Sequence, residues 1–257
     1  MAERNERHSG LFLHAHDTAR GDRIVNFLCP EGLLPLFIFG GPKSSLRSSA
    51  MPFTLAEIEA YCDARTDFIK LTGVNVLEIF TGVQNSFAHM RAATGAAEFV
   101  LRTSAFGGDS TEALGMMIEL LRQLEELSEA ETELALHIFL WKSLGPLGLA
   151  PDTGNCERCN RSFSERGSMP GRLLKGEQSI LCARCAEERR IQGFPASAMI
   201  VFDEEARGCL GAIAQQTYAG ATTALATSAA RDNVVTIIES LAESAAEGPL
   251  QTLRLFH

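Results

Sequence analysis

The chain has 257 residues, of which 46% are hydrophobic and 21% are charged, the proportions of a folded globular protein rather than a disordered one. Its formal net charge is −9, whereas nucleic-acid-binding proteins normally carry a basic excess, so binding of that kind would need local clusters of cations. No apolar run approaches the roughly 20 residues that a membrane-spanning helix needs, so no membrane partner is expected.

The first 80 residues predict a β-rich domain. Strand-forming residues separated by turn signals favour three early strands, at 8–18, 23–29 and 33–39. Residues 68–80 contain Gly73 among β-branched and aromatic residues, which predicts two strands or one strand with a bulge. Residues 54–64 are ambiguous, because Thr54 and Glu57 form a capping-box pattern that can begin a helix.

From about Gly82 the apolar pattern becomes helical, and a Gly-Gly-Asp-Ser segment at 107–110 interrupts it. Three stripes of residues are expected to face a core: Val83, Phe87, Met90 and Thr94; Leu114, Met117, Ile118, Leu121 and Leu124; Leu134, Ile138, Trp141 and Leu144. After residue 192 the chain returns to helix, best defined over 231–241. We therefore expect helical segments at 81–152 and 193–257, with a separate module at 153–192 between them.

Cysteine spacing identifies that module. Cys156, Cys159, Cys182 and Cys185 form two C-x2-C pairs separated by 22 residues, and four thiolates are the tetrahedral ligand set that Zn²⁺ prefers. One structural Zn²⁺ per chain is predicted, with no position left open for catalysis. A thiol-based redox centre is a weaker alternative, because it needs one such pair at the start of a helix rather than two.

The other three cysteines, Cys29, Cys62 and Cys209, are scattered and odd in number, as is typical of free thiols in a reducing compartment. The first seven residues are charged and lack the apolar stretch of a secretory signal. We therefore expect a cytoplasmic protein. No catalytic motif is recognisable, and His14, His16, His89 and His137 have no ligand-like partners in the sequence.

Positive charge is concentrated in two places. Residues 153–192 carry 8 basic and 5 acidic side chains, and this +3 falls to about +1 once four thiolates and Zn²⁺ are counted. The remaining segments, 1–80, 81–152 and 193–257, have balances of −2, −6 and −4. A second, smaller concentration lies in the β-rich domain, where Lys43 and Arg47 flank a Ser-rich loop and Arg20 and Arg23 flank a Gly-Asp turn.

Several short segments, in order, resemble the RecO family of bacterial recombination mediators. The resemblance is carried by Gly10–Leu13 followed by Asp17 and residues 21–25, by residues 40–47 followed by 51–54, and by residues 144–151 before the first cysteine pair. It extends over about residues 8–190. The cysteine quartet is its most specific motif.

The resemblance implies an α+β protein with an N-terminal OB-fold β-barrel in residues 1–80, followed by a helical bundle with an inserted four-cysteine zinc finger. It also implies that residues 54–64 form a strand, since an OB-fold needs five. The implied function is not enzymatic. Such a protein binds single-stranded and double-stranded DNA, anneals complementary strands and helps to load RecA in gap repair by the RecF pathway, with RecR and single-strand-binding protein as expected partners.

On this interpretation Arg20, Arg23, Lys43 and Arg47 are the expected nucleic-acid-binding residues, because cations beside small hydroxyl side chains can approach phosphate. Five cations of the cysteine module form a second candidate surface: Arg158, Arg161, Arg172, Lys175 and Arg184. Aromatic residues of the β-rich domain could stack on bases or pack inside the barrel: Phe37, Phe39, Phe53, Tyr61 and Phe68.

A different class of function also fits the sequence. The acidic balance and the few cations in the 41–47 loop are compatible with a zinc-stabilised protein-interaction adaptor that has little affinity for DNA. Salt-dependent binding of single-stranded DNA separates the two interpretations, since phosphate contacts make affinity fall steeply with salt.

Overall fold

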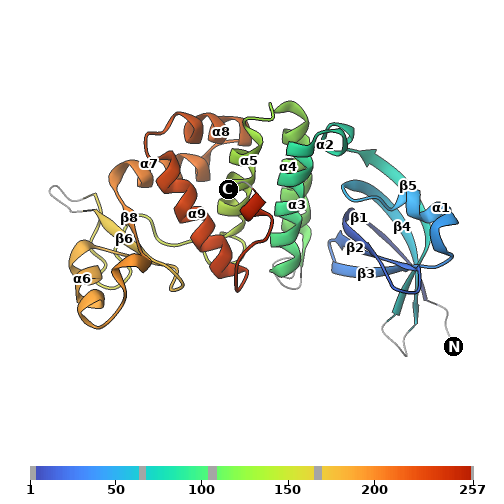
Figure 1. Ribbon diagram of the computed structural model, residues 1–257, viewed down its shortest axis with the longest axis horizontal. Coiled ribbons are helices and arrows are strands. Elements are labelled where there is room, and N and C mark those ends of the chain that lie inside the picture. Colours follow the sequence, from blue (N-terminus) through green and yellow to red (C-terminus); the bar gives the residue numbers. More distant parts are fainter. Residues whose placement is uncertain (1–3, 64–67, 104–108, 165–169, 256–257) are drawn as a thin grey trace. The chain divides into compact units, whose positions relative to one another are not determined.

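The computed structural model describes residues 4–63, 68–103, 109–164 and 170–255 (Figure 1). The chain forms two compact units, Met1–Thr132 and Glu133–His257. The described residues of the first unit form a five-stranded β-barrel, two short helices between its third and fourth strands, and three helices after the barrel. Those of the second unit form helices and a three-stranded sheet. The protein is therefore of the α+β class, as predicted, while the boundaries at residues 80, 152 and 192 stay predictions.

Five strands form a closed barrel in the order β1-β2-β3-β5-β4. All neighbours are antiparallel except β3 and β5, which run parallel and close the barrel. The strands and the short helices between the third and fourth of them are β1 (Arg4–Asp17), β2 (Arg23–Cys29), β3 (Gly32–Ile38), η1 (Gly41–Lys43), α1 (Ser45–Ser49), β4 (Thr54–Asp63) and β5 (Phe68–Ile79). This topology confirms the predicted OB-type barrel.

The ambiguous segment is strand β4, and the reason is visible in its burial pattern. Ala56, Ile58 and Ala60 are buried inside the barrel, whereas the intervening Glu57 and Glu59 are exposed. This period of two matches a strand with one face in the core. Long-range pairing with β1 and β5 therefore prevails over the local capping-box pattern.

Strand β5 is one strand with a bulge, the second of the two predicted arrangements. Gly73 pairs with Glu59 and Leu71 pairs with Ala60, so Thr72 is the extra residue. The Thr72 hydroxyl donates to the Glu59 carbonyl at 2.9 Å. A bulge of this kind increases the local bend and twist of a strand, which a small closed barrel requires.

The rest of the first unit is helical: α2 (Thr81–Asn85), α3 (Phe87–Arg102) and α4 (Thr111–Glu126). The first predicted stripe is wrong at Phe87, which is 79% exposed, and at Thr94, which is also exposed; Val83, on α2, is buried as predicted. The buried face of α3 consists largely of alanines, at positions 92, 93, 96 and 97. Small residues let a helix approach its neighbours closely, and Phe99 and Val100 complete the buried face.

The stripe predicted for α4 is confirmed at Met117, Leu121 and Leu124, which are fully buried. The predicted break between the two helices agrees with the end of α3 at Arg102 and the start of α4 at Thr111. Residues 107 and 108 of that break lie outside the described residues.

The second unit contains α5 (Thr132–Ser143), whose residues Leu134–Trp141 are all buried, as the predicted stripe there requires. A helix that is apolar on all sides belongs inside a core. The other elements of this unit are β6 (Gly171–Leu174), β7 (Ser179–Leu181), α6 (Ala183–Ile191), η3 (Ala196–Ala198), β8 (Met199–Phe202), α7 (Glu204–Gln215), α8 (Tyr218–Thr227), α9 (Arg231–Ala245) and η4 (Leu253–Leu255). The predicted helix at 231–241 is α9.

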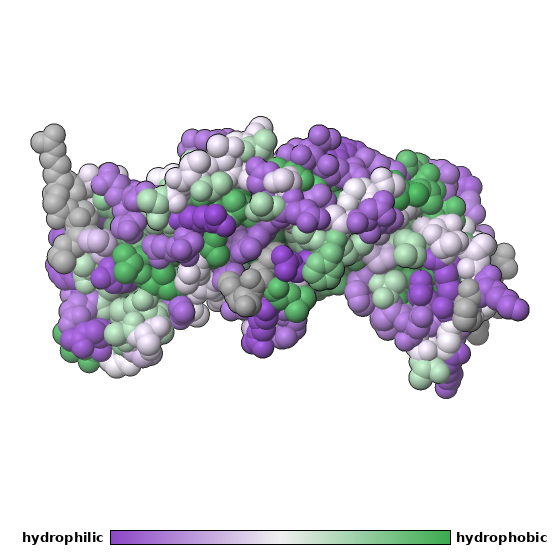
Figure 2. Space-filling model, turned by 45° about the horizontal axis from the view of Figure 1, so that its top comes forward, coloured by the Kyte–Doolittle hydropathy of each residue, from purple (hydrophilic) through white to green (hydrophobic). Residues whose placement is uncertain are grey.

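The visible surface mixes hydrophilic residues with smaller apolar patches (Figure 2). Among the described residues, no helix combines the length and the apolar character that crossing a membrane would require.

Candidate metal centre and nucleic-acid interface

The first cysteine pair lies on a tight turn. The N–H of Cys156 donates to the Arg161 carbonyl at 2.8 Å, and the N–H of Asn160 donates to the Cys156 carbonyl at 2.8 Å. Asn160 adopts a positive φ of 56°, a conformation that asparagine tolerates better than most residues. The turn therefore presents Cys156 and Cys159 on the same side.

The second pair lies at the start of a helix. Cys182 is the N-cap residue of α6, and Cys185 is in its first turn. The hairpin of β6 and β7 leads the chain from the first pair to the second, with Leu181 as the last residue of β7. This knuckle, hairpin and helix arrangement is that of a zinc finger, as the spacing predicts.

The four thiol sulfurs lie within 4.8 Å of one another, and Cys159 is the one that is partly exposed. The Sγ atoms of Cys159 and Cys182 are 3.7 Å apart. Two ligands of a tetrahedral Zn²⁺ at its usual Zn–S bond length are separated by about 3.8 Å. The cluster could therefore hold a metal ion of that size with little rearrangement.

The thiols differ in acidity without a metal. A hydrogen bond from the backbone of Arg161 lowers the pKa of Cys159 to about 7, whereas burial raises the pKa of Cys185 to about 12. Four thiolates would repel one another in this space, so a divalent cation is needed to hold all four deprotonated.

The cysteine cluster is supported by a three-stranded sheet in the order β7-β6-β8. Strand β8 lies beyond residue 192 and pairs with β6 along its length. Asn233 on α9 donates to the Val201 carbonyl at 3.0 Å, and Gln178 donates to the Ser244 hydroxyl at 3.2 Å. The module is thus tied to helix α9 of the same unit.

A second group of metal-ligating atoms, from His8, Cys29 and Glu31, converges in the barrel unit. His8 lies 3.2 Å from Glu31 and 3.5 Å from Glu6, and the buried Cys29 thiol donates to the Gly32 carbonyl at 3.3 Å. Burial raises the pKa of Cys29 to about 12. These contacts satisfy the group internally, so we assign it a hydrogen-bonding role. The sequence did not predict this group, because His8 is on β1 whereas Cys29 and Glu31 are at the β2–β3 hairpin, and no short sequence motif connects them.

Two of the four cations predicted to bind nucleic acid share one carboxylate. Arg23 donates to Asp17 at 2.8 Å and 3.3 Å, and Arg47 donates to the same group at 3.2 Å. The hydrogen bond from Arg23 is the main reason that the pKa of Asp17 is lowered, so this carboxylate is charged at neutral pH. Arg20 and Lys43 are exposed at the surface. The pairing leaves these two as the cations most accessible to a ligand.

Arg47 has the environment of a structural residue. Its side chain on α1 is only 8% exposed and also donates to the Gly21 carbonyl, which fixes α1 against the turn that carries Arg20. Whether Arg47 contacts DNA stays a prediction, but its guanidinium is already engaged by two acceptors.

We expect replacement of Arg47 by Met to lower the free energy of unfolding by about 1.5–3 kcal/mol, the usual range for hydrogen bonds to a charged group. Urea denaturation measures this directly. Lys43→Met is the matched control, because Lys43 is exposed, and its stability should be unchanged. Equal stability of the two variants would show that the Arg47 contacts contribute nothing.

The cysteine module is less cationic than its composition indicates. Arg158 and Arg184 both contact Glu188, at 3.0 Å and 3.9 Å, and Arg172 donates to backbone carbonyls. Arg161 and Lys175 are exposed. Among the described residues, these two of the five proposed cations form no ion pair, whereas Arg158 and Arg184, though also exposed, do.

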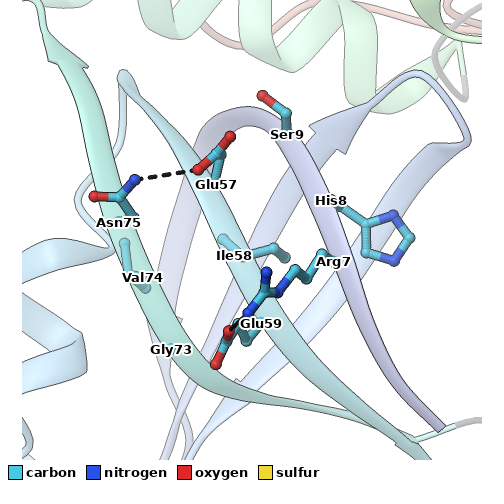
Figure 3. Close-up of a pocket in the computed structure, with 9 residues that line it drawn as sticks. All are labelled: Arg7, His8, Ser9, Glu57, Ile58, Glu59, Gly73, Val74 and Asn75. Atoms are coloured by element: carbon cyan, nitrogen blue, oxygen red, sulfur yellow. Dashed lines mark hydrogen bonds and ion pairs between the residues drawn. The ribbon is translucent and has the colours of Figure 1, made fainter.

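A pocket of about 580 Å³ lies on the outer surface of the barrel, over β1, β4 and β5 (Figure 3). Its acidic groups are already bound: Glu59 pairs with Arg7 at 2.6 Å, and Glu57 accepts from Asn75 at 3.1 Å. In Figure 3 the two pairs lie one beyond the other along β4, that of Glu57 reaching across to β5 and that of Glu59 to β1. The pocket carries more negative than positive charge, which disfavours phosphate here.

His137 is a core residue. It is fully buried on α5, and its ring nitrogens lie 2.8 Å from the Glu133 carbonyl and 3.0 Å from a Glu239 carboxylate oxygen. It links α5 to α9 and takes no part in the cysteine cluster.

One comparison with known proteins gives a match. Residues 84–196 match the family model described as "Recombination protein O C terminal". The matched range begins within α2, includes all four cysteines and ends in η3, so it excludes the barrel. No curated protein sequence matches the chain.

Proposed function

Because the chain belongs to the RecO family, as its match over residues 84–196 shows, we propose that this recombination and repair protein binds DNA and anneals complementary strands. The proposed binding site is in the barrel, outside the matched range. We further propose that it helps to load RecA onto gapped DNA, with RecR and single-strand-binding protein as partners, and that it works in the cytoplasm without catalysing a reaction.

The observation that carries the proposal is a closed five-stranded barrel with the exposed cations Arg20 and Lys43 beside one end of it. Small barrels of this kind bind single strands in grooves lined by cations. Annealing requires no covalent step. It requires cations that reduce repulsion between two phosphate backbones while the bases remain free to pair.

We propose that the four cysteines hold one Zn²⁺ with a structural role. All four coordination positions of a tetrahedral ion would be filled by Cys156, Cys159, Cys182 and Cys185, so none would remain for a substrate. The metal would stabilise the β6–β8 sheet and α6, and the family's function would depend on it only through the fold.

The deciding experiment is fluorescence-monitored annealing of two complementary oligonucleotides, combined with titration of single-stranded DNA at two salt concentrations. Faster annealing and binding that weakens steeply with salt support the proposal. A folded, metal-loaded protein that shows neither effect would contradict it.

Replacing Lys43 with Ala should weaken single-strand binding similarly for every base sequence, because a phosphate contact carries no sequence information. The slope of log K against log [salt] should become shallower by about 0.7, the value for one phosphate contact on a single strand. Fluorescence anisotropy over a salt series measures both quantities.

Arg254→Ala is the matched control, because it removes one exposed cation from the second unit. Its slope should equal that of the wild type. The same loss of slope in both variants would mean that net charge, and not Lys43, governs binding.

A second function is favoured by one observation: Asp17 neutralises part of the basic cluster of a chain whose net charge is already −9. A zinc-stabilised adaptor with little DNA affinity would have these properties. It would bind protein partners but show no salt-sensitive binding in the annealing experiment.

A further inference from the structure

Three phenylalanines lie together on the outer surface of the barrel. On β3, Leu36 and Ile38 point into the core, so Phe37 and the next outward residue, Phe39, are on the outside. The rings of Phe37 and Phe68 are stacked with centroids 4.3 Å apart, and those of Phe39 and Phe68 are 5.4 Å apart. This arrangement is a continuous aromatic surface across two strands.

A cation and a fourth ring lie in the same outward row. Lys70 pairs with Phe37 of β3 on one side and with Tyr61 of β4 on the other. The Lys70 ammonium is 5.8 Å from the centre of the Phe39 ring. We call Phe37, Phe39, Tyr61, Phe68 and Lys70 the aromatic face.

Packing at the β3–β5 junction explains only part of the aromatic face. Strands β3 and β5 share only two register pairs, and the stacked rings of Phe37 and Phe68 strengthen this short junction. Phe39 and Tyr61, however, remain 41% and 37% exposed. Large aromatic side chains left in water beside a cation are typical of a binding surface.

We propose that the aromatic face is a base-stacking subsite for single-stranded DNA, with Phe39 as the main platform. The inference rests on the proposed DNA binding and adds the group on the ligand that the barrel recognises. A base stacks on Phe39 and contacts Tyr61, while Lys70 lies close enough to bind the adjoining phosphate.

The chain that follows Phe39 adds a second phosphate contact. Gly40 and Gly41 have positive φ angles of 98° and 65°, a conformation that favours glycine. They turn the backbone so that Lys43, four residues after Phe39, is exposed on the loop. A strand bound at the aromatic face would therefore meet cations on both Lys70 and Lys43.

Charge on the barrel surface limits where the DNA can lie. Along β4, the outward positions before Tyr61 are Glu59 and Glu57, which line the acidic pocket of Figure 3. A phosphate backbone avoids that end of the strand and favours the end with Lys70. A duplex would not use the subsite, because its base faces are already covered by stacking.

The test compares oligothymidine with an abasic oligonucleotide of the same length, measured by fluorescence anisotropy at fixed salt. The wild type should bind oligothymidine more tightly. Phe39→Ala should weaken oligothymidine binding by about 5-fold to 100-fold, the range for one lost stacking contact, and leave abasic binding unchanged. Phe39→Trp should bind oligothymidine about as tightly as the wild type, unlike Phe39→Ala. The fluorescence of the introduced tryptophan should be quenched by oligothymidine and not by the abasic oligonucleotide.

Phe87→Ala is the matched control, because Phe87 is the more exposed phenylalanine and lies on α3, outside the aromatic face. It should bind both ligands as the wild type does. Circular dichroism checks the fold of each variant, and Tyr61→Ala replaces Phe39→Ala if that variant is unfolded; a smaller loss in the same direction is expected.

The outcomes separate the two proposals. A wild type that binds neither oligonucleotide contradicts DNA binding itself. A wild type that binds both equally, with no effect of Phe39→Ala, overturns the stacking subsite and leaves phosphate binding intact.

Discussion

Cys185→Ser is expected to abolish metal binding and to unfold the module formed by β6, β7, β8 and α6. Cys185 is buried, and its sulfur is one of four within 4.8 Å. Structural zinc sites have apparent binding free energies of about 10–16 kcal/mol, which is as large as the stability of a whole domain. Metal analysis should fall from one Zn²⁺ per chain to none, and the thermal transition should shift to lower temperature.

Helix α9 should lose stability in the same variant, because its contacts at Val201 and Gln178 come from the module. Chelation of the wild-type protein should reproduce the effect. Cys62→Ser is the matched control, since Cys62 lies on β4 outside the cluster, and it should retain one Zn²⁺. An unchanged thermal transition after complete metal removal would refute a structural role for the ion.

Gly10→Ala is expected to disrupt the barrel. A Cβ at Gly10 would lie 2.1 Å from the Leu28 carbonyl oxygen and 2.9 Å from the Phe27 ring. Gly10 immediately precedes Leu11, where β1 begins to pair with β2 while still paired with β4, so the backbone cannot move away without breaking a ladder. We expect a loss of about 3 kcal/mol or more, at the upper end of the range for overpacking.

Gly115→Ala provides a control of opposite sign in the same unit. Gly115 is exposed in α4, and no atom lies within 4 Å of an added Cβ. Alanine should therefore stabilise the helix by about 0.5–1 kcal/mol. Urea denaturation compares both variants with the wild type. Equal effects of the two substitutions would show that the close approach at Gly10 is absent in solution.

Local sequence patterns predicted most of the barrel because strands with one buried face alternate with a period of two. Residues 23–29 were predicted with their observed bounds, and Gly73 indicated the bulge in β5. The face of α3 could also have been found. Ala92, Ala93, Ala96 and Ala97 recur at one- and four-residue intervals, which is the pattern of one helix face. The predicted stripe was built on large apolar residues such as Phe87 and therefore did not include these alanines.

Pairing of charges could not be predicted from the sequence. Arg23 and Arg47 both looked available for phosphate, but both contact Asp17, and Arg47 is 30 residues away from it along the chain. The contact forms only in the folded protein, where Arg47 on α1 reaches Asp17, the last residue of β1. Counting cations therefore overestimated the positive charge that this surface presents.

The sequence by itself determined the four-cysteine cluster that could hold a metal ion, because a C-x2-C turn places two thiols together by local geometry and two such pairs make four candidate ligands. It also determined the strands, through periodicity. Only the tertiary structure decided which cations remain accessible and which aromatics form one surface. Tyr61 is on β4, Phe68 is on β5 and Phe39 directly follows β3, so their proximity depends on the register of the closed barrel, which is a property of long-range pairing.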